Sequence, residues 1–175
     1  AIYAVYAAAT KFGFDDVSKM PAEEIMTSIS KLDPNSEEYK EILEFAKRNI
    51  KMFNIAKSLF NAKNGEEATK IYERVEKYEG ISDRMEVEIA KYLTKAAEGR
   101  LSNVSKKNVH ALLRVVSEIE SIGDSSFNLA KTIMRKRNDG KEYSPEMTKR
   151  VENMFVLVDQ ALEEMMQVLN ENMAD

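Results

Sequence analysis

The sequence of 175 residues has no cysteine and a single histidine, His110. The lack of cysteine excludes disulfides, thiolate metal sites and cysteine nucleophiles, and it suits a reducing compartment such as the cytoplasm. Glycine (6) and proline (3) are scarce, which favours helices in a chain rich in Glu, Lys, Ala, Leu and Met. The net charge of −4 provides no basic excess for phosphates and argues against nucleic-acid binding.

Long apolar runs are also missing. No stretch reaches the roughly 18–20 residues that span a bilayer. The opening AIYAVYAAA is apolar but short, and it has no basic leader, so it does not resemble a signal peptide. Because the sequence begins there without a methionine, we expect it to be a piece of a longer protein.

Turn and capping residues divide the chain into helices with apolar residues spaced near 3.6. Two short helices are expected within residues 1–35, as an N-terminal extension. Residues 36–175 form the main domain, in which Ser36, Ser105 and Ser144 are expected N-caps. Its four long helices are expected at 37–62, 66–98, 106–137 and 145–172. Because the connections are short, the predicted fold is all-α, an antiparallel up-down bundle of spectrin-like helices.

Two acidic motifs stand at matching positions of the second and third long helices. They are EGISD, from Glu79 to Asp83, and ESIGD, from Glu120 to Asp124. Each motif lies about 26 Å from the turn that joins these helices, at 1.5 Å per residue. An antiparallel hairpin therefore brings the motifs to the same height.

The acidic stripes of both helices become apolar toward their ends, unlike a solvated face. The four carboxylates are therefore expected to be partly buried and to face each other. Such a cluster requires protonation, a basic partner (Arg84, Arg114 or Lys131) or bound cations, and spacing alone leaves these alternatives open. Gly80 and Gly123 are expected to allow a close approach of the helices.

These residues resemble the PhoU family, whose all-helical bundles carry paired E(D)xxxD motifs on adjacent antiparallel helices. The surrounding strings are DRMEVEIAKYLTKAAEGRLS and SEIESIGDSSFNLAKTI. They resemble most closely the cytoplasmic, C-terminal PhoU-like domain of bacterial sodium/phosphate cotransporter family proteins. The resemblance covers about 37–170 and does not extend to residues 1–35.

The resemblance implies a domain that regulates phosphate uptake, has no catalytic activity and binds metal. The implied ligands are Glu79, Asp83, Glu120 and Asp124, and the implied cofactors are divalent or trivalent ions such as iron, zinc, manganese or nickel. A full PhoU has two three-helix repeats and four motifs, so half of that apparatus is missing here, and a partner copy is one way to supply it.

Further residues have alternative interpretations. Glu86 lies on the acidic stripe and is either a fifth ligand or a solvated or lysine-paired residue. Asn128, one turn after Asp124, either contacts a ligand-held water or bridges helices. Asp159 and Glu163 are expected to be surface residues.

The expected partners follow from the resemblance and from charge. They are a transmembrane transport domain or transporter and, for the methionine-rich last helix, a second copy of the chain. Six basic residues are expected to gather at one end of the bundle, where they are either solvated or contact an anionic membrane surface: Lys57, Lys63, Arg135, Lys136, Arg137 and Lys141. The expected location is cytoplasmic and membrane-associated.

Two other functions compete with this interpretation. A di-iron carboxylate enzyme normally needs Glu-x-x-His motifs, but Lys107 stands three residues before His110, so an enzyme is not expected. The other alternative is a helical interaction or dimerisation domain without bound metal.

Overall fold

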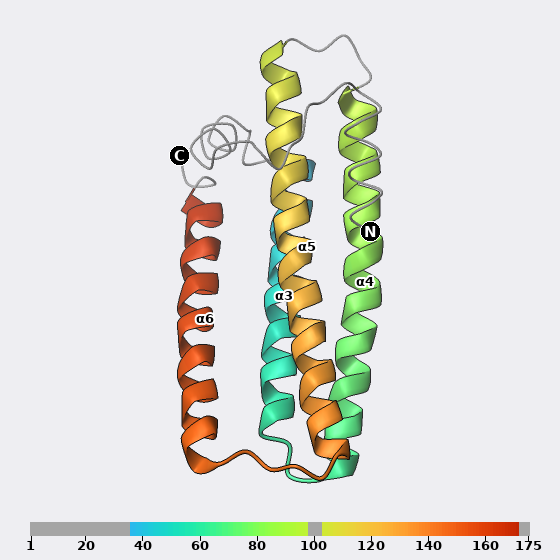
Figure 1. Cartoon of the computed structure of the whole chain (residues 1–175). Coiled ribbons are helices and arrows are strands. Elements are labelled where there is room, and N and C mark those ends of the chain that lie inside the picture. The colour runs from blue at the N-terminus through green and yellow to red at the C-terminus, as the bar shows by residue number, and fades with distance from the viewer. Residues whose placement is uncertain (1–35, 98–102, 172–175) are drawn as a thin grey trace.

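A computed structural model describes residues 36–97 and 103–171, and these residues form four α-helices (Figure 1). The helices are α3 (Glu37–Phe60), α4 (Gly65–Ala97), α5 (Asn103–Asn138) and α6 (Pro145–Glu171). They run up and down, with the α3–α4 and α5–α6 connections at the same end. The predicted all-α bundle is therefore confirmed. The short helices expected within residues 1–35 lie outside the described residues.

Side-chain caps explain where three of the helices begin. The Ser36 hydroxyl accepts a hydrogen bond from the Tyr39 amide at 3.2 Å, and Ser144 does the same for the Met147 amide at 3.2 Å. At the start of α4, Asn64 caps the Glu67 amide at 2.9 Å. Each cap satisfies an amide that has no partner inside the helix.

The expectation of an N-cap at Ser105 is wrong, because α5 already begins at Asn103. Several residues able to cap a helix occur together at this point, namely Ser102, Asn103 and Ser105. Residue type alone therefore does not locate the first turn.

The three helices α3, α4 and α5 pack against one another along their lengths. Two apolar clusters fill this bundle, one toward each end. The first includes Phe45, Leu93 and Leu113, and the second includes Met52 and Ile133. Helix α6 stands beside this bundle (Figure 1) and packs mainly on α3.

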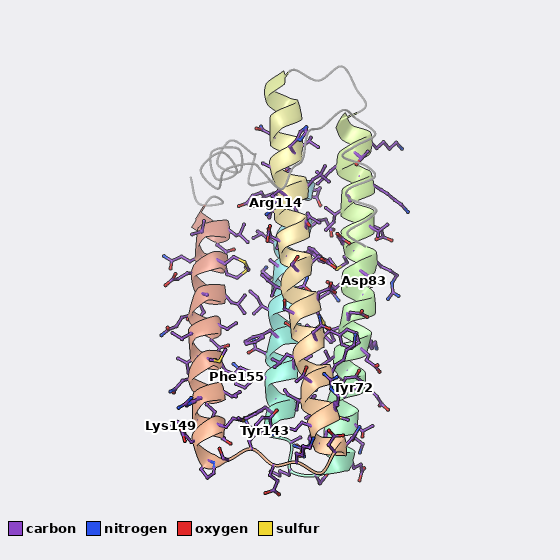
Figure 2. All side chains as sticks on the ribbon, viewed as in Figure 1. Tyr72, Asp83, Arg114, Tyr143, Lys149 and Phe155 are labelled. Atoms are coloured by element: carbon purple, nitrogen blue, oxygen red, sulfur yellow. The ribbon has the colours of Figure 1, made fainter. Side chains whose placement is uncertain are left out.

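Aromatic packing holds α6 in place. Phe155 makes edge-to-face contacts with Phe53 and Phe60 of α3, with ring centroids 6.1 and 5.6 Å apart. It lies on the side of α6 that faces the other helices, whereas Lys149 lies on the opposite side (Figure 2). Lys57 of α3 adds an ion pair with Asp159 of α6 at 2.6 Å.

A polar junction joins the three bundle helices midway between the two apolar clusters. Asn49 of α3 is buried; its amide donates to the Phe45 carbonyl at 3.0 Å, and its Oδ1 accepts from the Ser82 hydroxyl of α4 at 2.8 Å. On α5, a Cβ added at Gly123 would clash with Asn49 Oδ1 and come within 2.9 Å of Met52 Cε. Gly123 is therefore needed for the close approach of α5 to α3.

The same expectation is wrong for Gly80, because a Cβ there would have no neighbour within 4 Å. None of the described helices comes close to Gly80, so the two glycines of the acidic motifs are not equivalent.

Candidate metal centre

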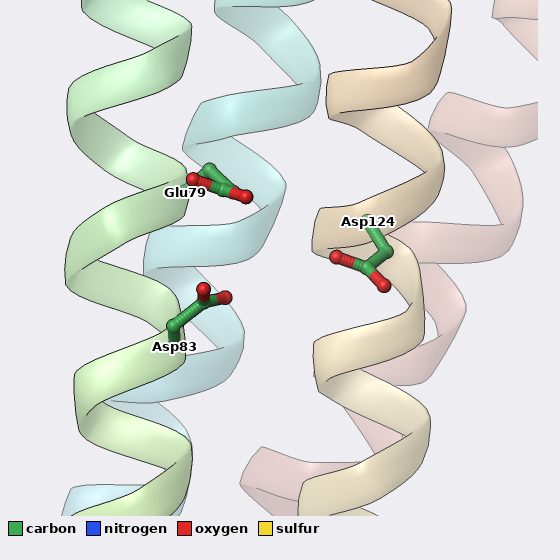
Figure 3. A group of neighbouring side chains, drawn as sticks. All are labelled: Glu79, Asp83 and Asp124. Atoms are coloured by element: carbon green, nitrogen blue, oxygen red, sulfur yellow. The ribbon is translucent and has the colours of Figure 1, made fainter. Parts of the chain in front are cut away.

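Three carboxylates from the two acidic motifs converge between α4 and α5. Glu79 and Asp83 lie one turn apart on α4, and Asp124 faces them from α5 (Figure 3). One oxygen of each lies within 4.8 Å of the others. Two oxygens that bind the same ion are separated by at most twice the metal–oxygen bond length. For bonds of 2.0–2.6 Å, this limit is about 4–5 Å. The spacing of these three residues therefore suits a shared cation.

Two more carboxylates extend this group into the interior. Glu86 is 0% exposed and Glu120 is 3% exposed. Within the part of the chain that the structure describes, both oxygens of Glu86 and the Oε2 of Glu120 have no hydrogen-bond partner. We call the five residues the acidic cluster: Glu79, Asp83, Glu86, Glu120 and Asp124. A buried polar atom without a partner costs about 1–3 kcal/mol, and more when it is charged.

Burial and mutual repulsion raise the pKa values of three members. The pKa of Glu120 rises from 4.5 to about 7, first through burial and then through the carboxylates of Asp124 and Glu86. Burial also raises the pKa of Glu86, with further increases from Asp83 and Asp124. The pKa of Glu79 is raised by burial and by Asp83, and Lys131 partly opposes this. Burial beside other carboxylates thus disfavours the charged forms of Glu79, Glu86 and Glu120.

No lysine or arginine forms an ion pair within 4 Å with a member of the acidic cluster, as far as residues 36–97 and 103–171 are concerned. Arg114 pairs with Glu118 on its own helix, and Arg84 is exposed. The Lys131 ammonium lies 3.7 Å from the centre of the Phe127 ring, so it influences Glu79 only from a distance. The expected basic partners therefore do not neutralise the cluster.

Apolar side chains close the site at both ends, as the residues flanking the motifs predicted. Toward the α3–α4 connection, Tyr72 stacks on Phe127 with ring centroids 6.2 Å apart. Toward the other end, the buried side chains of Ala90, Leu93 and Leu113 follow. This apolar enclosure limits hydration of the carboxylates and so strengthens any charge interaction inside.

The structure brings most of the predicted site residues together. Glu79, Asp83 and Asp124 lie within reach of one ion, and Glu120 lies beside them as a buried neighbour of Asp124. Glu86 is buried, so the interpretation of it as a solvated residue is wrong. Among the described residues no lysine pairs with it. Asn128 is exposed on α5, and neither of its suggested roles is tested.

The close approach at Gly123 was predicted from sequence, but the contacts of Asn49 behind the site were not. Ser82 precedes Asp83 and Gly123 precedes Asp124, so the hydrogen bond from Ser82 to Asn49 and the contact of Gly123 with Asn49 fix the two motifs against α3. The one available signal was Asn49 itself, which is a polar residue within the apolar stripe of the first long helix.

The predicted gathering of basic residues occurs at the end where α3–α4 and α5–α6 connect, but most members have local partners. Arg137 donates to the Ala62 carbonyl at 2.7 Å, and the Lys136 ammonium lies 3.0 Å from the centre of the Tyr143 ring. Lys141 pairs with Asp139 at 3.4 Å, and Lys57 is paired with Asp159. Lys63 and Arg135 are exposed.

The fold and the site define a helical bundle with carboxylates converging between two antiparallel helices. The family model of the PhoU domain matches residues 42–133, more than half of the chain. The chain therefore belongs to the PhoU domain family. A search of the curated proteins and a search of the solved structures each gave no match. None of the helices in the described residues is long and apolar enough to cross a membrane.

Proposed function

We propose that this chain is a non-catalytic regulatory domain for phosphate uptake that binds metal through the acidic cluster. Glu79, Asp83 and Asp124 would hold a divalent or trivalent ion, with the buried Glu120 and Glu86 adjoining it. Oxygen donors of this kind suit iron, manganese and other hard or intermediate cations. A bound cation would neutralise several carboxylates at once.

One observation carries the proposal: two buried glutamates with unpartnered oxygens adjoin three clustered carboxylates, and no lysine or arginine of the described residues pairs with any of them. A carboxylate cluster with a purely structural role would normally include a basic partner, because a buried charge left without its partner costs about 3–5 kcal/mol. A cation supplies the missing positive charge without an additional side chain.

The transport context of the proposal comes from the sequence resemblance to sodium/phosphate cotransporter C-terminal domains. It suggests a cytoplasmic domain of a longer protein that contacts a transmembrane transport domain. The end of the bundle with Arg135, Lys136 and Arg137 is the candidate surface for that domain or for an anionic membrane. Because Lys136 and Arg137 already have local partners, Arg135 is the strongest candidate for such a contact.

Metal analysis of the natural chain tests the proposal. The chain is purified without a chelator or a polyhistidine tag, and its metal content is measured by inductively coupled plasma mass spectrometry. We expect bound metal in the wild type and only trace metal in the variant with Asp83→Asn and Asp124→Asn. The control, Glu73→Gln with Glu88→Gln, removes two negative charges from exposed positions of α4 and should keep its metal. A wild-type chain with no metal above trace would refute the proposal.

An interaction domain without metal is the second candidate, and the raised pKa of Glu120 favours it, because a proton can replace a cation near pH 7. Thermal melting separates the two functions. If protons alone neutralise the cluster, the double Asp→Asn variant melts at the same or a higher temperature than the wild type. If metal does, added Mn²⁺ raises the Tm of the wild type only.

A further inference from the structure

Helix α6 carries a second apolar stripe that the described residues cover only in part. Its inner stripe, formed by Phe155, Leu162 and Leu169, is buried. The second stripe, which we call the outer seam, has apolar residues spaced alternately by four and three: Met147, Val151, Met154, Val158, Ala161, Met165 and Val168. Val151 and Met165 of this stripe pack against the core clusters, whereas its other members are exposed. Met154, for example, is 63% exposed. This unbroken spacing over three heptads is the pattern of a helix that packs on another helix.

The outer seam borders a groove between α5 and α6 of about 430 Å³. Phe53 of α3 belongs to its lining, Ile122 and Leu129 of α5 form one wall, and Val158 and Leu162 of α6 form the other. The α5 rim carries the small side chains Ser121 and Ser125, which allow a helix to approach closely. Glu118, which pairs with Arg114, also lines this rim, so the groove offers a helix an apolar floor with a polar edge.

The charged residues beside the outer seam favour a second copy of this chain as the partner. Arg150, Leu157 and Glu164 follow each other at seven-residue intervals along its solvent edge, and all three are exposed. This edge has a basic residue in its first half, an apolar residue at its centre and an acidic residue in its second half. Arg150 pairs with Glu146 of its own helix at 2.6 Å, and both side chains are exposed, so Arg150 can also reach a partner. When a second α6 lies antiparallel, each Arg150 is opposite the other copy's Glu164, and the two Leu157 side chains meet. A parallel pair would instead place like charges together, which is unfavourable.

We propose that two copies of this chain associate through an antiparallel pairing of their α6 helices, with each outer seam seated in the other copy's groove between α5 and α6. The interface is isologous, so every contact occurs twice about a two-fold axis. It is separate from the acidic cluster, which lies between α4 and α5.

Sedimentation equilibrium of the full chain tests the pairing, over about 1 μM to 1 mM. We expect the wild type to approach twice the mass of 20.0 kDa. Leu157→Asp places two carboxylates at the two-fold axis and should weaken the dimer at least about 30-fold, as loss of a central hot spot does. The matched control is Val156→Asp, because Val156 is the preceding residue, is 55% exposed where Leu157 is 65% exposed, and points away from the seam. It should change the affinity by less than about 3-fold.

A charge exchange tests the orientation. Arg150→Glu and Glu164→Arg should each weaken the dimer, and the double variant should restore it. A monomeric wild type at 1 mM, as expected if a different protein or another part of the chain occupies the seam, overturns the proposal. A dimer that tolerates Leu157→Asp, or a double variant that is weaker than both single variants, also overturns it.

Discussion

Glu120→Gln is expected to weaken the loss of stability that the metal-free protein shows as the pH rises toward neutrality. In the wild type, burial and the neighbouring carboxylates raise the pKa of Glu120 from 4.5 to about 7. A difference of this size between the unfolded and folded states corresponds to on the order of 3 kcal/mol. Because the carboxylates of Asp124 and Glu86 add to this difference, it reflects the acidic cluster rather than Glu120 alone.

The sign follows from which state holds the proton. The folded protein retains the Glu120 proton between about pH 4.5 and 7, whereas the unfolded chain has lost it. The free energy of unfolding is therefore highest below pH 4.5 as far as this group is concerned, and it falls as the pH rises to 7. Glu79 and Glu86 act in the same direction because their pKa values are also raised. His110 acts in the opposite direction, since burial lowers its pKa.

Urea unfolding at pH 5, 6, 7 and 8 in excess chelator measures this effect. Comparing the wild type with Glu120→Gln cancels the contribution of His110, because both proteins contain it. We expect the difference in unfolding free energy, variant minus wild type, to increase as the pH rises. At pH 8 this difference should be about 3 kcal/mol larger than at low pH. The control is Glu118→Gln, two residues away on the exposed side of α5, which should change stability by less than about 0.5 kcal/mol.

Saturating Mn²⁺ should reverse the response of the wild type. Metal binding requires deprotonated carboxylates, so the stability of the metal-bound protein should rise with pH. In Glu120→Gln the added stabilisation by Mn²⁺ should be smaller. A difference between the wild type and Glu120→Gln that does not vary from pH 5 to 8 in chelator would show that Glu120 is not buried as a protonated acid, and the reasoning would fail.

Two further predictions concern the scaffold. Gly123→Ala should destabilise the fold by about 1–3 kcal/mol, because the new Cβ would meet Asn49 and Met52. Gly80→Ala should instead stabilise the fold by up to about 1 kcal/mol through helix propensity. Urea unfolding of both variants measures this contrast, and equal effects on stability would refute it. Phe155→Ala should release α6 from α3, because it removes the aromatic contacts between them. Amide hydrogen exchange should then become faster in α6, while α3, α4 and α5 keep their protection. A uniform loss of protection in all four helices would contradict the separate packing of α6.

Helical periodicity and the two motifs predicted much of this molecule. The described helix ends lie within three residues of the expected ones, because long amphipathic helices give a strong repeating signal. Counting residues from the connecting turn placed Asp83 and Asp124 at the same height, and they do share a site. Local spacing suffices for such features, because an antiparallel hairpin converts distance along the chain directly into height.

Features that depend on three helices at once were not predictable. The sequence left Glu86 open as a fifth ligand or a solvated or lysine-paired residue, and only the packing of α4 against its neighbours buries it completely. The role of Gly123 depends on Asn49, 74 residues earlier in the chain. The short α5–α6 connection likewise did not reveal that α6 packs mainly on α3, since that choice depends on the aromatic contacts of Phe155 with Phe53 and Phe60.

If the proposed dimer forms, the second copy of the chain could supply the second pair of motifs that this sequence lacks. The family match ends at Ile133, before α6, so the matched unit is the three-helix bundle that holds the acidic cluster. On α5, Asp124 faces α4, whereas Ile122 borders the groove beside α6. If the cluster is complete within one copy, Leu157→Asp should produce monomers with unchanged metal per chain. If the second copy supplies ligands, Leu157→Asp should lose its metal when it becomes monomeric. Measuring the metal content of the monomer fraction by mass spectrometry distinguishes these two outcomes.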